Sequence, residues 1–109
     1  MPVHRRSIQD KRADDTRYRE LRDRLVAEWR GVASAPPLPD IDEETDARDR
    51  VVNVVVTWDE WADLDAQTRS EIIVDAYQIV KPPEAIAELA MAMGVTSAEA
   101  GRLRAAPGR

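Results

Sequence analysis

Two tryptophans and several carboxylates lie close together in the middle of the chain, and they are the residues best suited to chemistry. A carboxylate that indole rings shield from water gains a raised pKa and can act as a general acid or base. Tryptophan is also among the residue types that most often anchor a protein interface. The cluster therefore raises two hypotheses, a carboxylate-based enzyme and a surface for a protein partner. It comprises Trp58, Asp59, Glu60, Trp61, Asp63 and Asp65.

The rest of the sequence gives the enzyme hypothesis little support. The chain contains no cysteine, so it has no thiol nucleophile and no thiolate metal ligand. Its single histidine, His4, is far along the chain from the tryptophans, and the sequence has no glycine-rich loop that could hold a phosphate. A reaction site normally combines a nucleophile, a base and an anion-stabilising group. We therefore expect a non-enzymatic protein and keep a small carboxylate-based enzyme as the least favoured alternative.

The function that we predict is a protein-interaction or regulatory module, such as an adaptor or a subunit. Trp58 is expected in the core. For Trp61 a place in the core and a place on the surface are equally compatible, because aromatic side chains mark both interiors and the centres of interfaces. Residues 40–49 are rich in Asp and Glu and are expected to extend the same surface. The predicted partner-contacting residues are Asp59, Glu60, Trp61 and Asp63.

The acidic run PDIDEETDARDR, residues 39–50, is a candidate cation site that lacks the required pattern. A calcium-binding EF-hand loop needs a glycine at its sixth position and a bidentate glutamate at its twelfth. The run has no such glycine, so a solvated acidic surface is the better interpretation. With no cysteine and one histidine in the chain, we expect neither a metal nor another cofactor.

Charge is unevenly distributed along the chain. The first thirty residues hold nine Lys or Arg against six Asp or Glu, whereas the remainder holds seven against fifteen. The whole chain has a net charge of −5. A basic arm and first helix that contact nucleic acid are therefore an alternative hypothesis. Acidic residues interleave with the basic ones, however, which is also typical of a solvated helix face with (i, i+4) ion pairs. The residues of this alternative are Arg5, Arg6, Lys11 and Arg12.

Length and hydropathy indicate one domain in the cytosol. A chain of 109 residues is long enough for a single modest core. The amino terminus has no apolar segment of the kind found in signal peptides, and no stretch approaches the length of a membrane span. We expect a flexible arm at 1–13, a single α+β domain at 14–106 and a tail at 107–109, with no membrane contact.

Apolar periodicity predicts a small three-stranded sheet with helices packed mainly on one face, in the order α-β-β-α-β-α. The sequence VVNVVVT is apolar on both faces and is therefore expected to be the central strand. Helices are indicated by apolar residues at steps of three and four, and by the capping pattern TSAE before the last one. The predicted elements are helix 16–30, strand 38–44, strand 51–58, helix 66–80, strand 88–94 and helix 96–106.

Residues 84–95, EAIAELAMAMGV, fit two structures. Their alanine-rich composition favours a helix, with Gly94 as its cap. Alternation of Leu89, Met91 and Met93 with small residues fits a strand equally well. A third strand satisfies more backbone of the two-faced valine strand than a lone hairpin would, so we predict a strand.

Three stretches in this order resemble the BolA-like family, small α+β proteins related in shape to type II KH domains. VVNVVVTWDEW resembles the family's valine-rich strand and acidic loop, DAQTRSEIIVDAY its following helix, and ELAMAMGVTSAEA its late strand and capped helix. The resemblance covers roughly residues 17–104 and implies the fold described above.

The same resemblance implies no ligand here. Family members that share an iron-sulfur cluster with a glutaredoxin use a histidine at the helix opening, where this chain has Gln67-Thr68-Arg69-Ser70. The KH-type route to RNA needs a Gly-x-x-Gly loop, and the four glycines of this chain do not form one. We therefore carry over the fold and neither cluster nor RNA binding.

Overall fold

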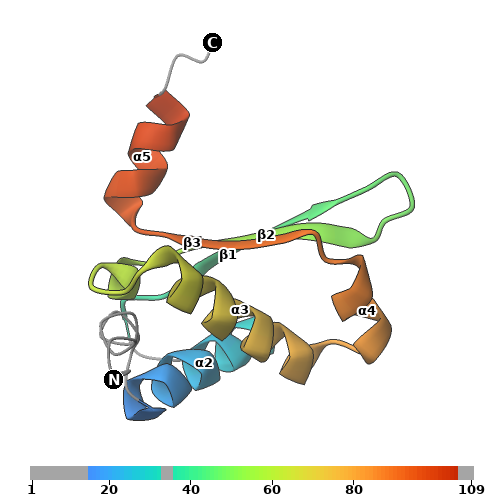
Figure 1. The fold of residues 1–109 in the computed structure, drawn as a ribbon, viewed down its shortest axis with the longest axis horizontal. Helices are drawn as coiled ribbons and strands as arrows, with labels where there is room; N and C mark the ends of the chain where they lie inside the picture. The colour runs from blue at the N-terminus through green and yellow to red at the C-terminus, as the bar shows by residue number, and fades with distance from the viewer. Residues whose placement is uncertain (1–14, 33–35, 106–109) are drawn as a thin grey trace, which may run out of the picture.

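The structure, a computed structural model, describes residues 15–32 and 36–105 (Figure 1). It confirms the α+β class and the order α-β-β-α-β-α, with an added 3-10 turn, η2, and an added short helix, α4. The predicted arm at 1–13 and tail at 107–109 lie outside the described residues. The elements are α2 (Asp15–Trp29), β1 (Asp40–Thr45), β2 (Val51–Thr57), η2 (Asp59–Trp61), α3 (Ala66–Val80), α4 (Pro83–Glu88), β3 (Met91–Val95) and α5 (Ser97–Ala105).

The three strands form one mixed sheet in the order β1-β2-β3. Strands β1 and β2 are antiparallel and form a hairpin, in which the Asp46 amide donates to the Arg50 carbonyl at 2.9 Å. Strand β3 pairs with β2 in parallel, because α3 and α4 return the chain to the end of the sheet where β2 begins. The valine-rich strand β2 is therefore central, as predicted.

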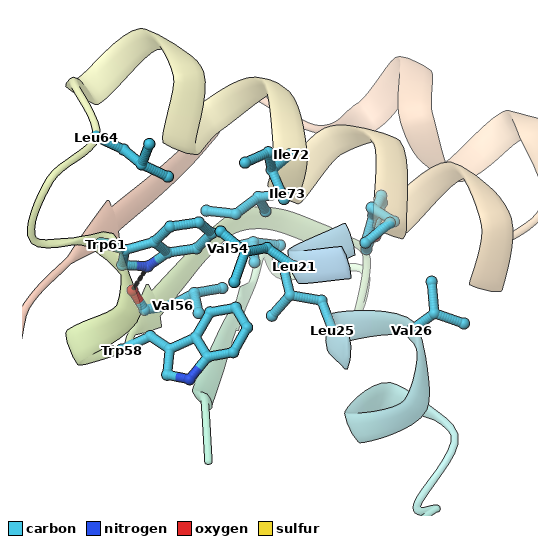
Figure 2. Packing of buried hydrophobic residues seen from close by; sticks show 12 residues of the cluster. Leu21, Leu25, Val26, Val54, Val56, Trp58, Trp61, Leu64, Ile72 and Ile73 are labelled. Carbon is cyan, nitrogen blue, oxygen red and sulfur yellow. Dashed lines mark hydrogen bonds between the residues drawn. The ribbon is translucent and has the colours of Figure 1, made fainter. Parts of the chain in front are cut away.

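Helices α2, α3 and α4 lie on one side of the sheet (Figure 1). Val54 and Val56 of β2 point toward this layer and are fully buried, where they meet Leu21 and Leu25 of α2 and Ile73 of α3 (Figure 2). Burying a side chain of this size stabilises a fold by about 1.5–3 kcal/mol. Among the described residues, the main hydrophobic core therefore lies between the sheet and the helices.

The helix ends follow from local capping. The Asp65 carboxylate accepts a hydrogen bond from the Thr68 amide at 2.9 Å and so caps the start of α3. Gly31, with φ of 73°, ends α2 in the left-handed region that favours glycine. Before α5, the Thr96 hydroxyl accepts from the Glu99 amide while the Glu99 carboxylate accepts from the Thr96 amide. This reciprocal pair is the predicted capping box.

Residues 84–95 contain both of the structures that their sequence allows. Pro83–Glu88 forms α4, and Met91–Val95 forms β3. The predicted strand is confirmed with a shift of a few residues toward the C-terminus, because Pro83 at the first helical position favours one more turn of helix. Gly94 is part of β3 and caps no helix.

None of the helices in the described part of the chain is both long and apolar enough to cross a bilayer.

Because neighbouring valines of β2 lie on different faces, Val-to-Thr substitutions at the two positions should change the free energy of unfolding by different amounts. Val54→Thr places a hydroxyl without a partner in the core, so we expect the free energy of unfolding to fall by about 1–3 kcal/mol. Val55→Thr, on the other face of the strand, is the matched control and should change it by less than about 0.5 kcal/mol. Urea unfolding measures both, and equal losses would contradict the face assignment.

Candidate functional site

Trp61 lies in the core. The sequence leaves a core and a surface position equally open for this residue. Its side chain is 0% exposed, and its indole N–H donates to the Val56 carbonyl at 3.1 Å (Figure 2). Trp58 is also buried, and the two rings meet edge to face with centroids 5.1 Å apart. Since Trp61 has no exposed surface, its ring cannot serve as the partner contact that the sequence suggested.

Gly94 makes this position of Trp61 possible. A Cβ atom at Gly94 would lie 2.8 Å from the Trp61 indole nitrogen and 3.0 Å from the Cβ atom of Arg69. Both distances are shorter than a Cβ atom normally keeps from another heavy atom, so the absence of a side chain at Gly94 leaves the room that the ring occupies. The glycine is thus required by packing.

The acidic residues next to Trp61 contact other parts of the chain. Asp59 accepts a hydrogen bond from the Ser97 amide at 2.8 Å and so holds the start of α5. Asp63 pairs with Arg17 of α2 at 3.0 Å, and its side chain is 70% exposed. Glu60 lies 3.5 Å from Arg24 of α2.

These contacts give the loop a structural role. Its carboxylates tie η2 to α2 on one side and to α5 on the other, and Asp65 caps α3. A carboxylate-based reaction site would bring such groups together around a substrate, whereas here Glu60 and Asp63 are directed to α2, Asp59 to α5 and Asp65 to the start of α3. Of the predicted partner-contacting residues, Asp59 and Asp63 are exposed, Glu60 is half-buried and Trp61 is buried.

Arg69 is the residue of this region that the sequence reasoning missed. It is a largely buried arginine whose Nε donates to the Leu64 carbonyl at 3.0 Å. One terminal nitrogen donates to the Gly94 carbonyl at 3.1 Å and to the Glu99 carboxylate at 2.7 Å. This hydrogen bond from Arg69, followed by one from the Thr96 amide, holds the pKa of Glu99 below its usual range.

A signal for Arg69 was present in the sequence. Arg69, Ile72, Ile73 and Ala76 follow the spacing i, i+3, i+4, i+7, which places the arginine on the apolar stripe of α3. A buried charge must be paired or hydrogen-bonded, so the stripe itself predicts partners for it.

The second face of the sheet, which we call the open face, carries a different surface. Because Val54 and Val56 point to the helices, their neighbours in β2 point away from them, and the register extends this alternation to β1 and β3. Among the described helices only α5 contacts this side, at the end of β3 (Figure 1). The open face comprises Asp40, Asp42 and Glu44 of β1, Asn53, Val55 and Thr57 of β2, and Met91 and Met93 of β3.

The open face has an acidic edge and an apolar edge. The three carboxylates that β1 contributes to this face are exposed, and Glu44 accepts a hydrogen bond from the Asn53 amide group at 2.8 Å. Met91, on the opposite edge, is 37% exposed. Beyond Met93, Val95 is covered where α5 meets β3, and Ala100 of α5 is buried. The predicted acidic surface at 40–49 is thus continuous with exposed methionine.

A hollow of about 360 Å³ lies on the helix side, between the base of the hairpin and helices α3 and α4. Arg50 forms ion pairs with Asp46 at 2.8 Å and with Glu88 at 2.9 Å. Tyr77 also lines the hollow, and burial, followed by the nearby Glu43 charge, raises its pKa. Of the charged groups that line the hollow, Arg50 and Glu88 are thus paired with each other, and Lys81 lies 3.8 Å from Glu43.

Within residues 15–32 and 36–105, no three His, Cys, Asp or Glu side chains are grouped so that they could hold a metal ion. The residues of the nucleic-acid alternative, Arg5, Arg6, Lys11 and Arg12, lie outside the described residues.

Comparisons with family models, with curated proteins and with solved structures find no match to this chain. The resemblance to the BolA-like family therefore stays a prediction.

The close approach of Trp61 to β3 predicts that the glycines of this region differ in their tolerance of alanine. Gly94→Ala should lower the free energy of unfolding by about 1–3 kcal/mol, because the added methyl group forces the indole and the strand apart. Gly101→Ala is the control, since nothing lies within 4 Å of its Cβ position. Because that alanine restricts the unfolded chain, it should stabilise by about 0.4–1 kcal/mol. Thermal unfolding of both variants measures the difference.

The hydrogen bond between Arg69 and Glu99 predicts a dependence of stability on pH. Because the folded state lowers the pKa of Glu99, its contribution is fully present above the unfolded value of about 4.3 and is lost as pH falls through the folded value. Glu99→Gln should therefore be less stable than the wild type at pH 7, and the difference in stability should shrink as the pH falls below the unfolded value. Urea unfolding at a series of pH values measures this. Curves that stay parallel down to pH 3 would show that the pair contributes nothing.

Proposed function

We propose that this chain is a non-enzymatic, cytosolic protein-interaction module, an adaptor or regulatory subunit that holds its partner on the open face of the sheet. The observation that carries the proposal is the difference between the two faces. One is covered by α2, α3 and α4 (Figure 1). The other presents the exposed carboxylates of β1 and the exposed Met91 of β3.

An exposed apolar edge next to a charged one supports binding of a macromolecule. Contiguous apolar surface on a folded protein marks interaction sites more often than chance. Methionine is flexible and polarisable, so it adapts to the surface that it meets. The carboxylates of Asp40 and Asp42 would add electrostatic attraction and fix the orientation of a partner.

The loop from Trp58 to Asp65 takes a smaller part in this proposal than its sequence suggested. Trp61 is buried, and Asp59 and Glu60 contact α5 and α2. Asp59 and Asp63 are the exposed carboxylates of this loop, and Asp63 lies between η2 and α3, where it pairs with Arg17.

Site-specific photo-crosslinking tests the proposal. A photoreactive phenylalanine analogue replaces Met91 on the open face, Asp63 on the loop, or Gln78 on the exposed side of α3, in the full chain. After irradiation in cells of the source organism, we expect the Met91 variant to yield a covalent adduct with one discrete protein. The Gln78 variant, as the matched control, should yield none. Mass spectrometry of the adducts identifies the partner.

The other outcomes are equally decisive. If none of the three positions gives a discrete adduct, the chain does not act by holding a protein partner on these surfaces, and the proposed function is wrong. If only Asp63 gives an adduct, the interaction function stands and the binding surface is the loop.

A further inference from the structure

The side chains of the open face change from acidic to apolar across the sheet, from β1 to β3. This gradient indicates the chemistry of a partner that would bind there. Each row across the sheet runs from a carboxylate of β1, through β2, to β3. Asp42 is paired with Val55, which is paired with Met93, and Glu44 is paired with Asn53, which is paired with Met91. A ligand lying along the strands therefore meets acid on one flank and apolar surface on the other.

The dimensions of this surface match one α-helix. Neighbouring strands are about 4.8 Å apart, so β1 and β3 are separated by about 10 Å, which is close to the diameter of a helix with its side chains. The strands are five to seven residues long, or roughly 17–23 Å. A helix of about 12 to 15 residues has the same length.

Addition of a strand to β3 is disfavoured by the contacts along its outer edge. The Ser70 hydroxyl donates to the Ala92 carbonyl at 2.6 Å, and Arg69 donates to the Gly94 carbonyl at 3.1 Å. These side chains of α3 occupy acceptors that a further strand would need. A ligand that uses both edges of the open face must therefore lie across its surface.

Helix α5 closes one end of this surface. It leaves the sheet after β3 on the side opposite to α2 and α3 (Figure 1). Ala100 is buried where α5 meets the sheet, and Leu103 follows three residues later on the same side of the helix, 60% exposed. Leu103 therefore offers apolar contact to a ligand on the open face and limits how far that ligand extends.

We propose that the open face binds a basic amphipathic helix of a partner protein, with its cationic row over Asp40, Asp42 and Glu44 and its apolar row over Met91 and Met93. This inference rests on the proposed interaction function and specifies the chemistry of the partner. Charge complementarity selects this occupant. A second copy of the chain presents no Lys or Arg on its own open face and carries a net charge of −5, so it lacks the cationic row that the acidic edge would attract.

Selection from an unbiased peptide library tests this chemistry. The full-length protein is immobilised and exposed to a phage-displayed library of random 16-residue peptides. We expect the enriched peptides to carry Lys or Arg at helical spacing on one side and apolar residues on the other. The dissociation constant of a synthetic peptide with the enriched sequence is then measured by fluorescence anisotropy for the wild type and the variants.

Two variants test the two edges of the surface. The acidic-edge variant, Asp40→Lys with Asp42→Lys, should raise the dissociation constant at least tenfold. The control, Glu20→Lys with Glu84→Lys, changes the net charge equally on exposed positions of α2 and α4, so it should change the constant less than twofold. The apolar-edge variant, Met91→Ser with Met93→Ser, should weaken binding at least tenfold. Circular dichroism checks that each variant unfolds cooperatively.

Several outcomes would overturn the inference. They are no enrichment of any peptide, enrichment of acidic or neutral peptides, and equal weakening by the acidic-edge and control variants. A full-length variant with Arg5→Ser, Arg6→Ser, Lys11→Ser and Arg12→Ser identifies one further occupant. If it binds the peptide tenfold more tightly than the wild type, residues 1–14 of the chain itself occupy the face, and the partner helix is wrong. A discrete adduct in the crosslinking experiment would in each case leave the proposed function standing.

Discussion

The guanidinium group of Arg69 is the interaction on which the arrangement of the C-terminal half depends. It joins the loop after η2 through the Leu64 carbonyl, strand β3 through the Gly94 carbonyl and α5 through Glu99. A buried charge that loses such partners costs several kcal/mol, so these three elements keep their places together. Trp61 packs beside this group because Gly94 leaves the space.

A single strand separates the two sides of the molecule. Val54 and Val56 of β2 bury one face under the helices, and Val55 between them belongs to the open face. The side chains of β1 divide in the same way. Glu43 points to the helices, where it accepts from the Trp29 indole at 2.9 Å, while its neighbours Asp42 and Glu44 point to the open face. An acidic strand thus contributes both to the helix layer and to the surface that we assign to a partner.

Much of the fold could be predicted because its signals are local. The valines of β2, the Asp65 cap and the Thr96 to Glu99 capping box each act over a few residues, and each is present in the structure. The place of Trp61 could not be predicted, because it depends on Gly94, which lies more than thirty positions away along the chain. The roles of Asp59 and Glu60 depend on α5 and α2 in the same way. Such distant contacts leave no local pattern in the sequence. The sequence therefore points to the loop as the candidate site, whereas the structure points to the open face of the sheet.

The parallel pairing of β2 and β3 has a consequence for the order in which the sheet is built. The hairpin of β1 and β2 closes over a short turn, which is fast, whereas β3 can pair only after the whole of α3 and α4 has been traversed. We therefore expect the acidic edge of the open face to form before its methionine edge. In that order, the like charges of partly folded molecules repel one another while the apolar side of the sheet is still incomplete.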